Sequence, residues 1–161
     1  MLLPVLAACI AGALTAACNS TGCTEGRSGI PKAAFYSSST GAALTVDSLR
    51  VYAVGAPGDS AIMDQSQRDA SVYLPLRADA STTDWCIAYK QQQLDYPWLI
   101  DTLHFEYTTQ PYFGSEECGV GYRYQIDYLS STHHLIDSVK LLDPLVTNID
   151  KTYVAIYFRT E

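Results

Sequence analysis

The sequence predicts an all-β protein: a two-sheet antiparallel β-sandwich, Ig-like or of a related Greek-key type, with about eight or nine strands and no long helix. Short apolar segments recur along the chain and are separated by turn-forming residues. No stretch keeps a helical period of 3.6 residues. The chain has 12 Tyr but only 4 Phe, and tyrosine is a residue that favours strands.

The predicted strands are short segments, each closed by Gly, Pro, Ser or Asp residues. They cover residues 32–37, 44–54, 60–64, 71–77, 84–90, 99–107, 120–128, 135–142 and 151–159. The polar residues 65–70 are interpreted as a loop or a single helical turn. Residues 153–158 are apolar at successive positions, which predicts a central strand that is buried on both faces.

Two segments alternate apolar and polar residues with a period of two, which predicts one buried and one solvated face. In the first, the predicted inward residues are Leu103, Phe105 and Tyr107, and the outward ones are Thr102, His104 and Glu106. In the second, the predicted inward residues are Val120, Tyr122, Tyr124, Ile126 and Tyr128.

The first 17 residues form an almost wholly apolar run, and the first charged residue is Glu25. A run that is shorter than the roughly 20 residues of a membrane span, and that ends in small residues, is typical of a signal peptide. Leu-Thr-Ala-Ala before Cys18 resembles the bacterial lipoprotein box, so Cys18 is predicted to carry the lipid. Lipidation at Cys9 and an ordinary cleaved signal are the alternatives.

These features divide the chain into three parts. Residues 1–17 are predicted to be a lipoprotein-type signal peptide, residues 18–30 an anchor and linker, and residues 31–161 a single β-sandwich domain. The predicted location is the cell envelope, lipid-anchored, facing the periplasm rather than displayed on the surface, because no acidic run follows Cys18.

Three cysteines remain in the mature domain, an odd number for an oxidising compartment. Cys86 lies between Trp85 and Ile87 in an apolar strand and is predicted to be a free, buried thiol. Cys23 and Cys118 lie in Gly-containing, loop-like contexts that can adapt to disulfide geometry. We therefore predict a Cys23–Cys118 bridge, which closes a loop of about 95 residues and adds about 4–5 kcal/mol in the chain-entropy model.

Several blocks of the sequence, taken in order, resemble a known family. They are Val-Asp-Ser-Leu-Arg-Val-Tyr at 46–52, Asp-Thr-Leu-His-Phe-Glu-Tyr at 101–107, Pro-Tyr-Phe-Gly-Ser-Glu-Glu-Cys-Gly at 111–119 and Thr-Asn-Ile-Asp at 147–150. The chain is similar to small Bacteroidota envelope lipoproteins that are classed only as a domain of unknown function. The resemblance implies export, a lipid anchor and two recurrent cysteines that match Cys23 and Cys118. It implies no catalytic residues.

The sequence contains no motif for catalysis, for a cofactor or for a metal ion, so we predict a protein that is not an enzyme. His133 and His134 are neighbours that would point to opposite faces of a strand, and His104 lies on another segment. Nucleic acid is excluded as a partner, because the net charge is −7 and no basic run occurs.

The predicted function is a non-catalytic exported lipoprotein that binds or scaffolds a partner, with the membrane contacted through the lipid and an envelope protein or a glycan as the further partner. The alternative is a carbohydrate- or peptide-binding module that uses Tyr96 and Trp98, an aromatic pair beside Gln91–Gln93. A hydrolase built from acidic residues is the third alternative, and it requires a pocket with two convergent carboxylates.

Overall fold

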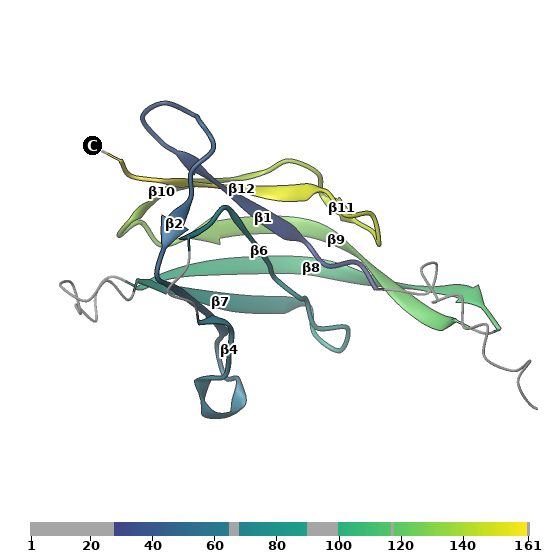
Figure 1. Ribbon diagram of the computed structural model, residues 1–161. Helices are drawn as coiled ribbons and strands as arrows, with labels where there is room; N and C mark the ends of the chain where they lie inside the picture. The colour runs from purple at the N-terminus through teal and green to yellow at the C-terminus, as the bar shows by residue number, and fades with distance from the viewer. Residues whose placement is uncertain (1–27, 65–67, 90–99, 117, 161) are drawn as a thin grey trace, which may run out of the picture.

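A computed structural model describes residues 28–64, 68–89, 100–116 and 118–160 of the chain. These residues form a β-sandwich of two main sheets with a small two-stranded ribbon beside them (Figure 1). The described part contains no α-helix, only the single 3₁₀ turn η2 at Pro57–Asp59. The predicted all-β fold class is confirmed.

The first main sheet has four strands in the order β10-β12-β1-β6. Their bounds are Ile136–Leu141, Thr152–Phe158, Lys32–Ser37 and Ser71–Tyr73. The first and last strands of the domain, β1 and β12, pair in parallel, whereas the other pairs of this sheet are antiparallel. Among the described strands, the predicted antiparallel sandwich therefore has one exception, the parallel β1–β12 pair. A parallel pair needs a long connection, and here the rest of the domain supplies it.

The second main sheet has six strands in the order β11-β9-β8-β7-β3-β4. Their bounds are Leu145–Val146, Gly119–Ser131, Ile100–Ser115, Thr82–Tyr89, Leu49–Ala53 and Ala61–Asp64. Every pair in this sheet is antiparallel. The ribbon is made by β2 (Val46–Asp47) and β5 (Arg68–Asp69).

Ten of the twelve described strands fall on the predicted segments, and β1 has the predicted bounds. The other two, β5 and β11, are only two residues long and were not predicted. The predicted strand at 44–54 is divided at Ser48, whose φ of 55° breaks the extended backbone and separates β2 from β3. The strands β8 and β9 are longer than predicted, at 16 and 13 residues.

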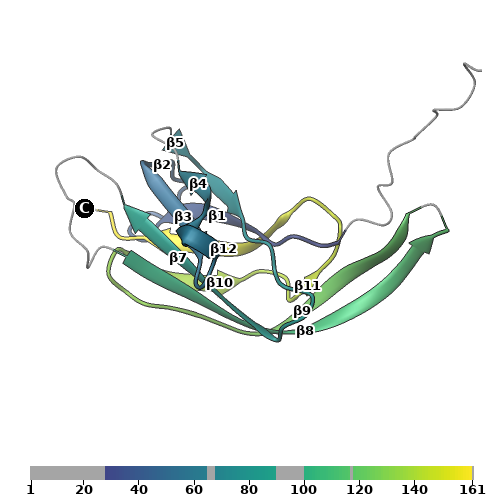
Figure 2. The ribbon, with the colours of Figure 1, turned by 90° about the horizontal axis from the view of Figure 1, so that it is seen from below.

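The predicted alternation is confirmed in β8, where Leu103, Phe105 and Tyr107 are buried. In β9 it fails at both ends. Asp127 is an extra residue, because Glu106 pairs with Tyr128 while Tyr107 pairs with Ile126. This bulge turns Tyr128 outward, so that 53% of its surface is exposed. Val120 is 56% exposed because it lies in the distal part of the β8–β9 hairpin, which extends beyond the four-stranded sheet (Figure 2).

The core lies between the inner faces of the two main sheets. Its largest buried side chains come from β1, β3, β7, β8, β9, β10 and β12 and include Phe35, Leu49, Ile87, Phe105, Ile126, Ile136 and Tyr153. Three buried tyrosines use their hydroxyl groups to hold connecting segments. Tyr107 donates to the Arg77 carbonyl oxygen at 3.0 Å, Tyr124 to Leu76 at 3.1 Å, and Tyr153 to Ile149 at 3.0 Å. These tyrosines therefore have their rings in the core, while their hydroxyl groups hydrogen-bond to backbone carbonyl oxygens outside the regular strands.

Candidate functional site

The predicted lipidation residue Cys18, the predicted disulfide residue Cys23 and the predicted contact residues Tyr96 and Trp98 lie outside the described residues. Cys118 is described: it is half-buried at the turn between β8 and β9, and its amide donates to Ser115 Oγ at 3.1 Å. Of the predicted site residues, Cys118 is therefore the one whose position the structure gives.

Cys86 is a free thiol, as predicted, but the prediction that it is buried is wrong. It is half-exposed on the outer face of the six-stranded sheet, where its sulfur lies 4.0 Å from Thr102 Oγ1. The reason is the alternation of β7: Trp85 and Ile87 occupy the two inward positions, so the residue between them must face outward.

The segment that leads into β1 is fastened to β9 before the first strand begins. The Gly29 amide donates to the Tyr122 carbonyl oxygen at 2.7 Å, and the Tyr122 amide donates to Ser28 Oγ at 3.1 Å. Gly29 is needed for this close approach, because a Cβ there would lie 2.8 Å from the Thr147 carbonyl oxygen. The chain therefore enters the domain at a fixed place, against β9 and the loop after β11.

A shallow hollow of about 230 Å³ lies beside this lead-in segment. It is lined by Ser28, Ile30, Tyr73 and residues 147–150. Its polar side chains already contact one another: Tyr73 donates to Asp150 at 2.9 Å, and Lys32 lies 3.7 Å from the same carboxylate. These contacts join β1, β6 and the Thr-Asn-Ile-Asp block, so the sequence block has a structural role here.

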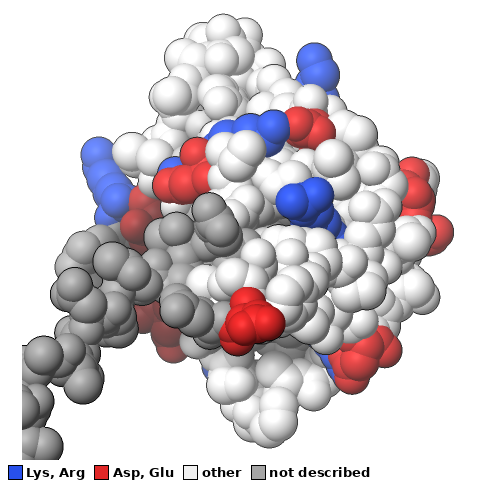
Figure 3. Space-filling model, turned by 90° about the vertical axis from the view of Figure 1, so that its right-hand side faces the viewer, with Lys and Arg blue, Asp and Glu red and all other residues white. Residues whose placement is uncertain are grey.

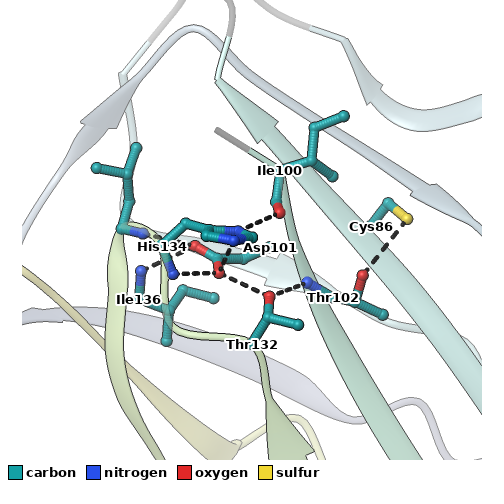
Figure 4. A network of polar contacts seen from close by, with 8 residues as sticks. Cys86, Ile100, Asp101, Thr102, Thr132, His134 and Ile136 are labelled. Atoms are coloured by element: carbon teal, nitrogen blue, oxygen red, sulfur yellow. Dashed lines mark hydrogen bonds and ion pairs between the residues drawn. The ribbon is translucent and has the colours of Figure 1, made fainter. Parts of the chain in front are cut away.

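The most extensive polar cluster surrounds Asp101, a fully buried carboxylate near the start of β8 (Figure 4). Its Oδ1 accepts hydrogen bonds from Thr132 Oγ1 at 2.7 Å and the His134 amide at 2.8 Å. Its Oδ2 accepts from the amides of Leu135 and Ile136 at 2.8 and 2.9 Å. Each oxygen therefore receives two bonds, and the donors lie in the segment that connects β9 to β10 and at the first residue of β10.

Asp101 fixes the β9–β10 connection in place. Buried charge is tolerated only when it is well hydrogen-bonded, and here the donors are supplied by backbone amides. Asp101 is the first residue of the Asp-Thr-Leu-His-Phe-Glu-Tyr block, but the amides that it binds are 33–35 residues away. Burial, and secondarily the Asp101 charge, raise the pKa of the nearby Tyr89 hydroxyl, so that Tyr89 stays neutral.

A second polar cluster is centred on His104, on the outer face of β8. Its Nδ1 contacts Asp84 Oδ1 at 2.5 Å, and its Nε2 contacts Glu106 Oε1 at 3.3 Å. The hydrogen bond with Asp84 is the largest cause of the raised pKa of His104. Because both ring nitrogens face carboxylates, protonation of the imidazole is favoured, and the ring links neighbouring positions of the sheet.

A larger surface cavity of about 420 Å³ lies at the edge of the sandwich near β4. Exposed Val54 and Ile62, together with the buried residues Leu76 and Trp85, supply apolar walls, and Arg77 is at the rim. The Tyr107 hydroxyl holds this rim, because the Arg77 amide donates to it at 3.0 Å. Among the described residues that line the cavity, Asp84 is the one acidic side chain, so they do not bring two convergent carboxylates together.

The distal end of the β8–β9 hairpin extends beyond the four-stranded sheet and carries exposed apolar side chains (Figure 2). We call residues 111–116 and 118–122 the hairpin tip. Phe113 and Val120 are cross-strand partners there and are 65% and 56% exposed. Sequence reasoning missed this surface, because the alternating pattern of 120–128 was read as buried along its whole length.

Two kinds of feature are absent from the residues that the structure describes. No group of three or more His, Cys, Asp or Glu side chains in this part of the chain is arranged to hold a metal ion. Among the same residues, no helix is long and apolar enough to cross a membrane.

The fold and the site define an all-β domain whose most extensive polar cluster fixes the β9–β10 connection. The chain belongs to the family of unknown function DUF6452, whose family model matches residues 48–158. The expected membership of a family without assigned activity is confirmed, whereas the envelope location and the lipid anchor stay predictions. No curated protein and no solved structure matches the chain.

Proposed function

We propose that the protein is a non-catalytic lipoprotein of the bacterial cell envelope, in which lipid on Cys18 holds the β-sandwich at a membrane so that the domain can bind or scaffold a partner. The observation that carries this proposal is the apolar run of 17 residues that stops at Cys18. A lipidated cysteine at this point anchors a folded domain without a membrane-spanning segment.

The way in which the chain enters the domain supports a short tether. Ser28 is already hydrogen-bonded to β9 and lies ten residues after Cys18. Ten residues span at most about 35 Å when fully extended. An anchor at Cys18 would therefore keep the domain close to the membrane, with the lead-in end toward the bilayer.

The occupied polar clusters support a role without catalysis. The Asp101 carboxylate oxygens already accept four hydrogen bonds from the β9–β10 region. Both ring nitrogens of His104 contact carboxylates. A general base or a nucleophile needs a free lone pair that faces a cleft. Neither cluster offers one, so we assign both of them to the stability of the domain.

A disulfide between Cys23 and Cys118 belongs to the same proposal. Cys86 is a free thiol, whereas Cys118 is not free. In the oxidised envelope, a bridge from Cys118 to Cys23 would tie the tether to the hairpin. Peptide mapping without reductant tests it: a linked Cys23–Cys118 pair is expected, and a linked pair that contains Cys86 would overturn it.

The anchor is tested by fractionation of cells that express the full-length chain. The wild-type protein and a Cys9→Ala variant are expected in the membrane fraction, because Cys9 lies within the signal peptide. A Cys18→Ala variant is expected in the soluble envelope fraction. Membrane association that survives Cys18→Ala, or that is lost in Cys9→Ala, would refute lipidation at Cys18.

The orientation is tested separately, on intact cells. The absence of an acidic run after Cys18 supports a domain that faces the periplasm. External protease is therefore expected to spare the domain until the outer membrane is permeabilised. Digestion in intact cells would place the domain on the cell surface instead.

A further inference from the structure

We propose that the hairpin tip docks on the bilayer itself, with Phe113 and Val120 inserted among the lipid headgroups and upper acyl chains. This inference rests on the proposed function, because it assumes that the domain is anchored through Cys18. It adds a second membrane contact, made by the folded domain, and thereby gives the anchored domain a defined orientation.

The tip carries the apolar face of the core out beyond the sandwich (Figure 2). Along β8 the inward positions Leu103, Phe105 and Tyr107 are buried, and the same face continues to Phe113. Val120 pairs with Phe113 across the hairpin, so the two exposed side chains form one continuous surface. A core-type surface without a cover is typical of an interaction site.

The chain's own linker is poorly suited to cover this surface. Residues 19–27 read Asn-Ser-Thr-Gly-Cys-Thr-Glu-Gly-Arg and contain no aromatic residue, Leu, Ile, Val or Met. Such a segment has no large apolar side chain with which to remove Phe113 and Val120 from water. The occupant must therefore come from outside the chain.

The bilayer is the apolar partner that the anchor brings closest. Gly29 bonds to Tyr122, and Val120 is two residues earlier in β9, about 7 Å along the strand. The tip and the tether attachment therefore lie at the same end of the domain. Because the lipid fixes the domain at the membrane, even a weak second contact forms at a high effective concentration.

The polar surroundings of the tip suit a membrane interface. The Arg123 guanidinium lies over the ring of Tyr112 at 4.4 Å, and such side chains place an apolar body in lipid and a polar end in water. On the part of this face that Figure 3 shows in colour, acidic and basic side chains are scattered and form no basic patch. Exposed Glu116 also opposes attraction to anionic lipid, so the contact must be mainly apolar.

The experiment places a tryptophan at the tip and asks whether lipid reaches it. The lipidated protein, carrying Trp98→Phe and Phe113→Trp, is reconstituted in vesicles of phosphatidylethanolamine with a minor share of phosphatidylglycerol. The acyl chains are brominated near the headgroups, which quenches indoles that enter that layer. Trp85 is 3% exposed and serves as the internal baseline.

A matched control carries Trp98→Phe and Val54→Trp, because Val54 is 58% exposed at the end of β3 but lies away from the hairpin. Bromination is expected to quench the Phe113→Trp protein roughly twofold more than this control, since an interfacial side chain lies about 5–10 Å deep in the membrane. Circular dichroism of both variants verifies that the sandwich is folded.

The outcomes separate this inference from the proposed function. Equal quenching of the two variants, while both float with the vesicles, would overturn the docking of the tip and leave the anchor intact. That result would also be expected if the tip served a protein partner. Failure of the purified protein to float with the vesicles would overturn the anchor, and the inference about the tip with it.

Discussion

Replacement of Asp101 by Asn is the sharpest test of how this domain is held together. Each carboxylate oxygen accepts two hydrogen bonds, and three of the four donors are backbone amides that cannot rotate away. The best Asn orientation places its NH₂ group toward Thr132 and His134. The Thr132 hydroxyl can then accept a bond, but the His134 amide loses its acceptor.

The cost follows from these contacts. One unsatisfied donor costs about 1–3 kcal/mol, and each of the two remaining bonds loses about 1 kcal/mol because its acceptor is no longer charged. We expect the Asp101→Asn variant to be about 3–5 kcal/mol less stable, a large part of the 5–15 kcal/mol typical of a domain. Urea denaturation, monitored by tryptophan fluorescence, measures the free energy of unfolding.

The control for this prediction is Asp127→Asn, which affects an exposed carboxylate that accepts one bond from Thr108. Its expected change is within about 0.5 kcal/mol. If Asp101→Asn costs less than about 1 kcal/mol, or no more than the control, the carboxylate does not fix the β9–β10 connection and the reasoning is wrong.

Three further predictions concern the His104 cluster, a core tyrosine and the lead-in segment. Asp84→Asn should lower the pKa of His104 in an NMR titration. Because protonated His104 stabilises the folded state, the stability advantage of the wild type over the variant should be full below about pH 6.5 and should disappear as the pH rises through the folded-state pKa. A stability advantage that grows with pH would refute this prediction. Tyr107→Phe should lower the free energy of unfolding, measured in urea, by about 1–3 kcal/mol, because the Tyr107 hydroxyl bonds Thr83 in the interior. The control Tyr73→Phe, at an exposed site, should change it by no more than about 0.5 kcal/mol. Equal effects of the two substitutions would contradict this prediction. Gly29→Ala should lower the free energy of unfolding by about 1–3 kcal/mol and expose the lead-in segment to protease, because the new Cβ meets the Thr147 backbone. An unchanged digestion pattern would contradict this prediction.

The sequence was sufficient to predict the fold class, because strand alternation is a local property. The inward face of β8 and the bounds of β1 follow directly from the residues between their turns. The strand predictions failed where the structure depends on residues that are distant in the sequence. The bulge at Asp127 reverses the alternation in β9, and nothing in the residues of that strand alone specifies it. The parallel pairing of β1 with β12 depends likewise on the whole topology.

The candidate site was less predictable than the fold. Asp101 opens one of the sequence blocks that carry the family resemblance, but its partners are amides from a distant connection. Every residue except proline has the same backbone donor, so the sequence does not identify these partners. The exposure of Phe113 could not be predicted either, because it depends on where the opposing sheet ends. The free state of Cys86 was predicted correctly, whereas its exposure was not. The exposure follows from the alternation of β7, in which Cys86 stands between two inward-facing residues.

The central claim, a lipid anchor at Cys18, is tested most directly by the mass of the protein extracted from membranes with detergent. Tandem mass spectrometry of the N-terminal peptide is expected to show a chain that begins at Cys18, with a diacylglyceryl group on its sulfur. An unmodified N-terminus at Asn19 or Cys23, or acyl groups on Cys9, would contradict the account.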